Sequence, residues 1–485
     1  MELKKLIHGL EIIKLHNCDK INATGIAYDS RSVLPGDVFV AVSGFETDGH
    51  KYINSAVSKG AVCVVCEHAP DVSVPYILVD NSRYALAILS SNFYLNPASE
   101  MKMIGVTGTN GKTTTTYLIK HLLESVKNEK VGLIGTNGNM IGDELFVTEH
   151  TTPESLDLQK LLRKMADMGC RYVVMEVSSH SLVLDRVAGI NFDIGIFTNL
   201  TQDHLDFHSD MTDYAKAKAK LFKNCKHGII NIDDPWSEQM ITEATCSIMT
   251  VSEKSYDADV IAKDIRLSPE GVRFAALAGN EIGMFSLGIP GLFSVYNALS
   301  VIACGLLLNI NMEQVAMSLA EAKSVKGRVE VVPTDGNYVI IIDYAHTPDA
   351  LLNVIKSLKL VTQGRVVVLF GCGGDRDKKK RPIMGEIAAN NADFVIVTSD
   401  NPRTENPSEI IMQILEGMKN TSTPKKVIEN RIEAIRWAIE NHKAEDVIIL
   451  AGKGHEDYQI IGKEKHHMDE REIVRDILED RRLKR

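Results

Sequence analysis

Residues 108–114 have the composition of a phosphate-binding loop. They lie between an apolar strand pattern at 103–108 and a helix pattern, and they are Gly108, Thr109, Asn110, Gly111, Lys112, Thr113 and Thr114. Glycines let successive backbone N–H groups point at phosphate oxygens, a lysine reaches the terminal phosphates, and the next hydroxyl can bind magnesium. The strict pattern needs glycine at 106, where this chain has valine, so the loop is a shortened variant. We predict nucleotide binding by residues 108–114.

Two further residues follow apolar strand patterns and could complete a nucleotide site. Glu176 ends the pattern at 171–176, and His204 follows the pattern at 193–200. An acidic side chain at the end of a neighbouring strand is a typical magnesium ligand in nucleotide sites. Either residue alone would more often be a solvated loop group. Beside a phosphate loop, they predict metal or phosphate contacts.

One lysine of the helix expected over 212–225 lies on the apolar face of that helix, where a solvated residue is not expected. At about 100° per residue, Lys216, Lys220 and Lys223 fall on a polar face, whereas Lys218 falls within the apolar face. An isolated buried ammonium is costly, so Lys218 must be paired or chemically altered. From spacing alone, an ordinary salt bridge is favoured over modification.

Two arginines and one aspartate have spacings that suit anion or ribose contacts. Arg328 precedes a strand pattern, and Asp343 ends it. An arginine near phosphates and an aspartate facing a ribose are both physically reasonable. Arg376 follows a glycine-rich turn at 371–374, and it stands at the position where a dinucleotide-binding fingerprint would need a third glycine. This excludes a dehydrogenase and favours Arg376 as an anion contact.

The elements that must position these residues alternate between apolar strand runs and helical periods. This alternation favours parallel sheets with crossover helices. Proline at position 97 and a polar turn at 333–336 interrupt it. We therefore predict an α/β fold with three domains: an N-terminal domain at 1–98, a central P-loop-type domain with a mostly parallel sheet at 99–332, and a C-terminal Rossmann-like domain at 333–485.

Composition excludes several other classes of protein. The 485 residues are 44% hydrophobic and 24% charged, with a net charge of −10 and eight cysteines. No basic stripe indicates nucleic-acid binding, and no apolar run approaches the ~20 residues of a membrane span. The cysteines are too sparse for a disulfide framework. Cys63 and Cys66 lie on one strand pattern and must face opposite sides, so we expect two buried thiols and no metal site. A cytoplasmic location is expected, because the N-terminus lacks a secretory signal pattern.

With these residues assembled, the chain resembles the Mur ligase family of peptidoglycan synthesis over essentially its whole length. Any one matching string is weak, but twelve in the family's order are specific. The strings are DSR (29–31), GTNGKTT (108–114), TTP (151–153), EVSSH (176–180), DHLDFH (203–208), YAKAKAKLF (214–222), YNAL (296–299), GRVE (327–330), DYAHTPD (343–349), GCGGDRD (371–377), DNPRTE (400–405) and AGKGHEDYQ (451–459).

The resemblance implies an ATP-dependent amide ligase that forms ADP through an acyl phosphate. Its substrates would be UDP-N-acetylmuramoyl-L-alanyl-D-glutamate and meso-diaminopimelate. It implies ATP, two magnesium ions and a CO2-derived carbamate on Lys218, with Thr113, Glu176, His204 and Lys218 holding the metals. The family would also place Ser30 at the uridine nucleotide, Thr151, Thr152, Ser178 and Arg186 on the muramoyl dipeptide, and Asn297, Arg328 and Asp343 along ATP. We expect a monomer.

The choice of amino acid depends on the string Asp400-Asn401-Pro402-Arg403. Diaminopimelate differs from lysine by an additional distal carboxylate, which a planar guanidinium can bind with paired hydrogen bonds. We assign that carboxylate to Arg403 and the other carboxylate to Arg376. Glu456 and the Gly452 carbonyl would hold the distal ammonium.

Two alternatives share the phosphate loop. One is a phosphoryl-transfer enzyme or nucleotide switch that forms no amide, and the other is a folylpolyglutamate synthase. Neither explains the DNPR string or the N-terminal domain that contains DSR.

Overall fold

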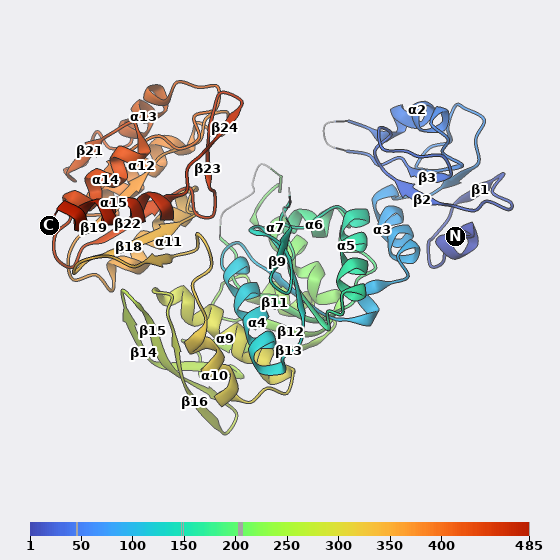
Figure 1. Ribbon diagram of the computed structural model, residues 1–485. Coiled ribbons are helices and arrows are strands. Elements are labelled where there is room, and N and C mark those ends of the chain that lie inside the picture. The colour runs from blue at the N-terminus through green and yellow to red at the C-terminus, as the bar shows by residue number, and fades with distance from the viewer. Residues whose placement is uncertain (45–46, 147, 149, 202–206, 485) are drawn as a thin grey trace. The chain divides into compact units, whose positions relative to one another are not determined.

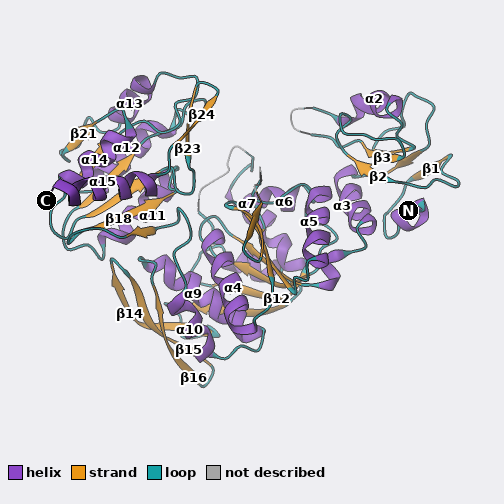
Figure 2. Ribbon diagram, viewed as in Figure 1, coloured by secondary structure: helices purple, strands orange, loops and turns teal. Residues whose placement is uncertain are grey.

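A computed structural model describes residues 1–44, 47–146, 148, 150–201 and 207–484 of the chain. The chain divides into two compact units, Met1–Thr250 and Val251–Arg485. Helices and strands alternate along both units, which confirms the predicted α/β class (Figures 1 and 2). Within the ranges given above, none of the helices is both long and apolar enough to cross a membrane.

The first sheet of the first unit has five strands in the order β1-β5-β4-β3-β2. Strands β2 to β5 are parallel, and β1 is antiparallel to β5. The strands are β1 (Lys14–His16), β2 (Gly25–Ala27), β3 (Asp37–Val40), β4 (Cys63–Cys66) and β5 (Tyr76–Leu78). The helices are α1 (Leu3–Leu6), α2 (Ile53–Ser58) and α3 (Ser82–Phe93), with 3-10 turns η1 (Gly49–Tyr52) and η2 (Pro97–Glu100).

Strand β4 separates two apolar clusters. Cys63 packs in the cluster that includes Leu6 of α1 and Leu89 of α3, whereas Cys66 packs in the cluster that includes Ala56 of α2. Both side chains are fully buried and both thiols are free. The predicted opposite orientation of the two cysteines is confirmed.

Eight strands of an 11-stranded sheet follow in the order β13-β12-β11-β6-β10-β7-β8-β9. Its strands are β6 (Lys102–Thr107), β7 (Val131–Gly135), β8 (Gly138–Ile141), β9 (Glu144–Phe146), β10 (Tyr172–Glu176), β11 (Phe192–Phe197), β12 (Cys225–Asn231) and β13 (Ser247–Ser252). The helices are α4 (Lys112–Lys127), α5 (Ser155–Asp167), α6 (Ser179–Val183), α7 (Met211–Ala219), η3 (Lys220–Lys223) and α8 (Ser237–Glu243).

The parallel strands β6, β7, β10, β11 and β12 set the position of the site. Their carboxyl ends meet at one edge of the sheet, so the segments that follow them lie near one another. Strands β8 and β9 are antiparallel additions at the far side. An apolar layer between the sheet and helices α5 and α7 contains Met103, Leu162 and Tyr214.

The helix predicted over 212–225 is shorter than expected. Helix α7 ends at Ala219, a 3-10 turn follows, and Cys225 already pairs with Phe192 in the sheet. Because the backbone of Cys225 is committed to a strand ladder, the helix cannot extend to that residue.

The second unit begins with an antiparallel meander that the sequence analysis did not predict. Its strands are β14 (Val260–Ser268), β15 (Gly271–Ala278) and β16 (Glu281–Leu287), covered by α9 (Leu292–Leu307) and α10 (Met312–Glu321).

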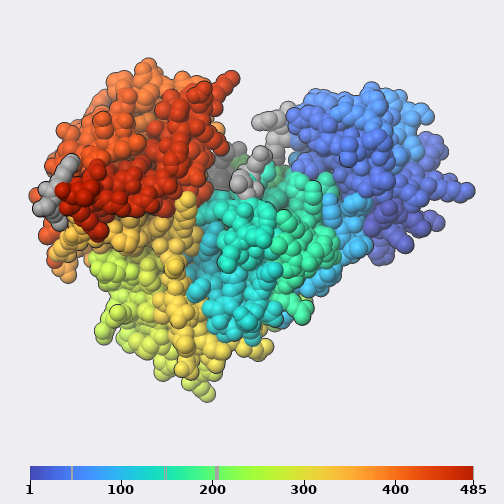
Figure 3. All heavy atoms as spheres, in the orientation of Figure 1, coloured from blue at the N-terminus to red at the C-terminus, as the bar shows by residue number. Residues whose placement is uncertain are grey.

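Apart from the antiparallel pair β23-β24, the remaining sheet has the order β17-β18-β22-β19-β20-β21. All neighbouring strands are parallel except β17, which is antiparallel to β18. Helix α15 (Glu470–Lys484) lies on the surface of this unit (Figure 3). The other elements are β17 (Glu330–Val332), β18 (Val339–Asp343), α11 (Pro348–Lys359), β19 (Val366–Phe370), α12 (Lys380–Asn391), β20 (Phe394–Val397), α13 (Pro407–Glu416), β21 (Lys425–Val427), α14 (Arg431–Glu440), β22 (Val447–Ala451), β23 (Tyr458–Ile461) and β24 (Glu464–His467).

Candidate active site

The phosphate loop joins β6 to the N-terminus of α4. Gly108 has φ 146°, and a Cβ there would lie 1.9 Å from Thr198 Oγ1, so only glycine fits. Gly111 precedes the helix with φ 84°, and no side chain caps the helix N-terminus. Lys112 folds back and donates from Nζ to the carbonyl oxygens of Gly108 and Thr109, both at 2.9 Å. An uncapped helix N-terminus beside a lysine is suited to bind phosphate.

Glu176 lies at the same edge of the sheet. It ends β10 and pairs in register with Val106, two residues before Gly108. Its carboxylate is buried and accepts hydrogen bonds from Thr136 N at 2.9 Å and Thr136 Oγ1 at 3.1 Å. The structure thus places the predicted acid beside the loop, whereas His204 lies outside the described residues.

Lys218 is buried as the helical wheel predicts. Its side chain is 1% exposed, while Lys216, Lys220 and Lys223 are exposed. Its Nζ donates to Gly108 O at 2.8 Å and lies 4.6 Å from the centroid of the Tyr214 ring. The lysine therefore reaches the phosphate loop from α7.

The residues expected on the muramoyl dipeptide lie together around Glu176. Thr152 Oγ1 donates to Glu176 O at 2.8 Å, and Ser178 N donates to Thr152 Oγ1 at 3.2 Å. Arg186 Nη1 donates to Thr152 O at 3.1 Å. Thr151 Oγ1 lies 3.1 Å from Thr136 Oγ1, the hydroxyl that also contacts Glu176.

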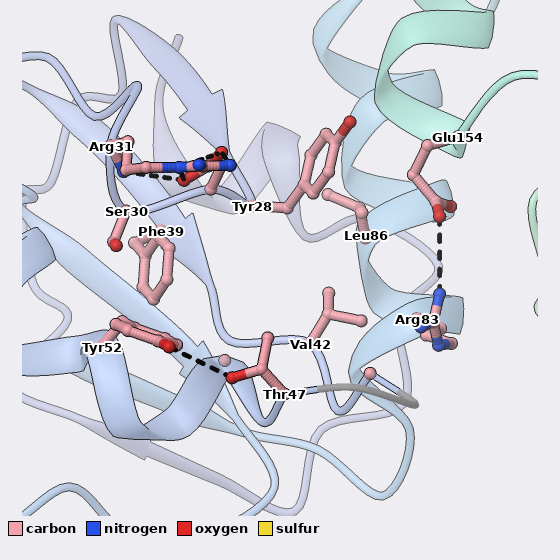
Figure 4. A pocket seen from close by; sticks show the side chains of 13 residues that line it. Tyr28, Ser30, Arg31, Phe39, Val42, Thr47, Tyr52, Arg83, Leu86 and Glu154 are labelled. Carbon is pink, nitrogen blue, oxygen red and sulfur yellow. Dashed lines mark hydrogen bonds and ion pairs between the residues drawn. The ribbon is translucent and has the colours of Figure 1, made fainter. Parts of the chain in front are cut away.

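Glu154 is a member of this site that sequence reasoning missed. Its Oε2 lies 3.3 Å from Arg186 Nε and 3.4 Å from Arg83 Nη1, which comes from α3 (Figure 4). The neighbouring Tyr28 hydroxyl donates to Asp157 at 2.7 Å. Burial and this carboxylate raise the pKa of Tyr28. Only the fold brings α3 to this segment, so spacing could not reveal these contacts.

Ser30 lines a cavity of about 460 Å3 in the first unit (Figure 4). This volume is within the ~300–1,000 Å3 typical of small-molecule sites. Phe39 and Tyr52 contribute rings, and Tyr52 OH lies 3.2 Å from Thr47 Oγ1. The same cavity reaches Arg83 and Glu154. The lining residues are Tyr28, Asp29, Ser30, Arg31, Phe39, Val42, Gly44, Thr47, Gly49, Tyr52, Arg83, Leu86 and Glu154.

In the second unit, the buried carboxylate of Asp343 holds the backbone next to Arg328. Asp343 accepts hydrogen bonds from Val329 N and Ala345 N, both at 2.8 Å. Burial raises the pKa of Asp343, and the Arg328 charge opposes that shift. The Arg328 guanidinium lies 4.9 Å from the centroid of the Tyr344 ring. Both oxygens of Asp343 thus fix the backbone around Arg328. Asn297 is buried on α9 of the same unit.

Arg403 is fixed from both sides. Its φ is 52°, its backbone N–H donates to Ile460 O at 3.1 Å, and its Nη1 donates to Gly374 O at 2.9 Å. Arg376 is exposed, and its Nη1 donates to the neighbouring Asp375 O at 3.4 Å. Both arginines flank Gly373, since a Cβ there would lie 3.0 Å from Arg403 Nη1 and 3.7 Å from Arg376 Cγ.

Asn401 and Glu456 are in direct contact. Asn401 Nδ2 donates to Glu456 Oε2 at 2.9 Å. Gly452 has φ 109°, and a Cβ there would lie 2.8 Å from Asp400 Oδ2. Asp400 and Pro402 are buried beside them. The buried Lys453 also belongs to this group, and the sequence analysis assigned it no role. The sequence signal for it is a lysine between two glycines directly after an apolar strand pattern.

Three family models cover most of the chain. The model "Mur ligase family, catalytic domain" matches residues 22–100, "Mur ligase middle domain" matches 106–305, and "Mur ligase, glutamate ligase domain" matches 327–454.

Curated relatives match along the full length. A UDP-N-acetylmuramoyl-L-alanyl-D-glutamate–2,6-diaminopimelate ligase from Caldanaerobacter subterraneus subsp. tengcongensis is 51% identical over 483 residues, covering 99% of each chain. The enzyme of the same name from Clostridium botulinum is 45% identical over 487 residues, covering 99% of this chain and all of the relative.

A solved structure with that name has a TM-score of 0.75 at 31% identity and covers 99% of both chains. The phosphate loop, the buried Glu176 and the three matched domains agree with this full-length similarity: the chain belongs to the Mur ligase family.

Proposed function

We propose that the chain is an ATP-dependent ligase that joins meso-diaminopimelate to UDP-N-acetylmuramoyl-L-alanyl-D-glutamate and releases ADP and phosphate. The observation that supports this best is the grouping of Lys112, Glu176, Thr152 and Arg186 at one edge of the sheet. A phosphate loop beside a group of hydroxyls and an arginine can hold ATP and a second anionic substrate together.

The loop residues fit ATP and magnesium. Glycines with positive φ and an uncapped helix N-terminus are typical of a phosphate-binding loop. Magnesium prefers oxygen ligands and is often shared with substrate phosphates. Thr113 and Glu176 offer such oxygens, and we assign His204 as a further ligand. Among the residues that the structure describes, no three His, Cys, Asp or Glu side chains form a metal cluster. When bound, two magnesium ions would offset the phosphate charge.

We assign a carbamate to Lys218. Carbon dioxide reacts with a neutral amine, and burial disfavours the ammonium form. The product replaces a cation by a carboxylate-like group next to the phosphate loop, where it can bind metal.

The chemistry follows from charge and proximity. A side-chain carboxylate oxygen of the D-glutamyl residue attacks the γ-phosphorus of ATP, which forms an acyl phosphate and releases ADP. The amine of diaminopimelate then attacks the acyl carbon, loses a proton, and phosphate leaves. Lys112 and the loop amides reduce repulsion between the two anions and hold them in line.

The second unit supplies the amino-acid end and part of the ATP contacts. Arg403 would bind the distal carboxylate of diaminopimelate, Glu456 and the Gly452 carbonyl its distal ammonium, and Arg376 the other carboxylate. Asn297, Arg328 and Asp343 would lie along ATP. Ser30 and its cavity would bind the uridine diphosphate end.

We further propose that the protein acts as a cytoplasmic monomer, with domain boundaries near 98 and 332. A phosphate-release assay with the muramoyl dipeptide and a panel of amino acids tests the function. Release that needs both the dipeptide and diaminopimelate supports the ligase. Release without the amino acid favours a phosphoryl-transfer enzyme, and release with a folate and glutamate favours a folylpolyglutamate synthase.

A further inference from the structure

Lys453 is a fully buried cation in the second unit. It follows β22 and lies between Gly452 and Gly454, which have φ 109° and 52°. Its Nζ donates to Asn401 Oδ1 at 2.5 Å, to Tyr458 O at 2.6 Å and to Glu456 Oε2 at 3.2 Å. An ammonium has three N–H donors, so these acceptors satisfy Lys453 completely.

The contacts of Lys453 fix two other side chains. Asn401 Oδ1 accepts from Lys453 and from Ile460 N, at 2.9 Å, which turns its Nδ2 toward Glu456. Glu456 Oε2 therefore accepts from Asn401 and from Lys453. Within the described chain, Glu456 Oε1 accepts no hydrogen bond. One oxygen of this half-buried carboxylate is held, and the other is left available.

We infer that Lys453 is a positioning residue that presents Glu456 Oε1 to the distal ammonium of the amino-acid substrate. The inference rests on the proposed function. Lys453 cannot itself bind the substrate, because its donors are all used and its side chain is 0% exposed. A buried cation persists only when it is paired, and here the pairing fixes the orientation of one carboxylate.

This role makes a specific statement about selectivity. A carboxylate held in place increases the affinity for a ligand that has an ammonium at that point, and it does not increase the affinity for a ligand that lacks one. 2-Aminopimelate, which is diaminopimelate without its distal amine, would gain nothing from Lys453. The ratio of kcat/KM for meso-diaminopimelate to that for 2-aminopimelate therefore measures the role.

The test compares Lys453→Met with Lys419→Met in the full-length protein. Methionine keeps the length of the side chain and removes all three donors, and Lys419 is an exposed lysine paired with Glu416 in the same unit. We expect the ratio to fall at least about tenfold in Lys453→Met, because a mobile carboxylate binds the ammonium poorly. The KM for ATP should stay within about twofold, and Lys419→Met should match the wild type. An unchanged ratio overturns the inference.

A second variant keeps the inference testable if Lys453→Met does not fold. Glu456→Gln alters only the end of a half-buried side chain, and it should reduce the same ratio at least as strongly. If Glu456→Gln leaves the ratio unchanged, the Glu456 carboxylate does not bind the distal ammonium, and the inference is wrong. In the double variant the losses should not add, because both act on one contact. Failure of the proposed function is distinguishable, since the wild type would then turn over neither amino acid.

Discussion

Lys112 and Lys218 donate hydrogen bonds to the same backbone oxygen, that of Gly108, at 2.9 and 2.8 Å. Two ammonium groups on one acceptor lie within about 6 Å of each other and repel. Bound phosphates would relieve that repulsion, and so would loss of the charge on one lysine. Lys112 is partly exposed at the start of α4, whereas Lys218 is buried, so we expect Lys218 to be the residue that loses its charge.

Replacing the loop lysine should abolish ATP turnover. Lys112→Ala removes the mobile cation on the transferred phosphate, and we expect kcat to fall at least about a hundredfold in the phosphate-release assay. Lys127→Ala, at the far end of the same helix, serves as the control. A Lys112→Ala variant that keeps about a tenth of wild-type turnover would contradict the assignment.

Replacing Lys218 should remove activity in a way that small carboxylates repair. Lys218→Ala is expected to lose at least about a hundredfold in kcat and to recover part of it in acetate or formate, because these anions can replace the carbamate as metal ligand. Lys216→Ala, on the exposed face of α7, should behave as the wild type. A structural salt bridge predicts no rescue, and a bare ammonium in a crystal with metal and nucleotide would refute the carbamate.

Arg403 should determine the choice of amino acid. We expect the wild type to prefer meso-diaminopimelate to L-lysine by about a thousandfold in kcat/KM, because an arginine without its carboxylate is left unpaired. Arg403→Ala and Arg403→Lys should both lose that preference, because neither an alanine nor a lysine side chain has the planar guanidinium that binds a carboxylate with two hydrogen bonds. The KM for ATP should change little. Arg475→Ala on α15 is the matched control. Comparable wild-type turnover of L-lysine would exclude this role.

His455 should make the second unit less stable in mild acid. Burial, with the charges of Arg328, Lys326 and Arg471, lowers the pKa of His455 from 6.5 to about 4, and Asp457 opposes this. Below pH 6.5 the unfolded chain binds a proton that the folded chain does not, so the free energy of unfolding falls until the pH reaches about 4. The loss should be up to about 3 kcal/mol.

Urea unfolding followed by Trp437 fluorescence measures this effect. A Trp236→Phe background removes the other tryptophan, which lies in the first unit. In that background His455→Gln should flatten the dependence of stability on pH between about 6.5 and 4, because glutamine does not titrate. An equal slope in both proteins would show that other groups cause it.

The orientations of Lys218 and of the two free cysteines Cys63 and Cys66 could be predicted from spacing, because 100° per helical residue and 180° per strand residue fix directions within one element. The meander β14–β16 could not. A register shift between Lys263 and Arg266 interrupts the alternation in β14, and the partners of each strand are defined only by pairing.

The site shows the same division. Loop composition and strand ends predicted the position of Lys112 and Glu176. The carboxylate of Glu154 and the ammonium of Lys453 have partners that come from distant segments, so their roles depend on the tertiary fold. For Arg376 the assignment to an anion stays a prediction: its guanidinium is exposed, and its side chain lies on the same side of Gly373 as that of Arg403.

The two apolar clusters of the N-terminal region share strand β4, which makes that region indivisible when it unfolds. Neither cluster can be opened while the strand remains in place, so Cys63 and Cys66 should react with a thiol reagent at one common rate. Burial raises the pKa of both thiols, to about 11 for Cys66, and this suppresses reaction in the folded state. The lifetime of these cysteines under oxidative conditions is then set by how often the whole region opens, and the chemistry of either sulfur has little part in it.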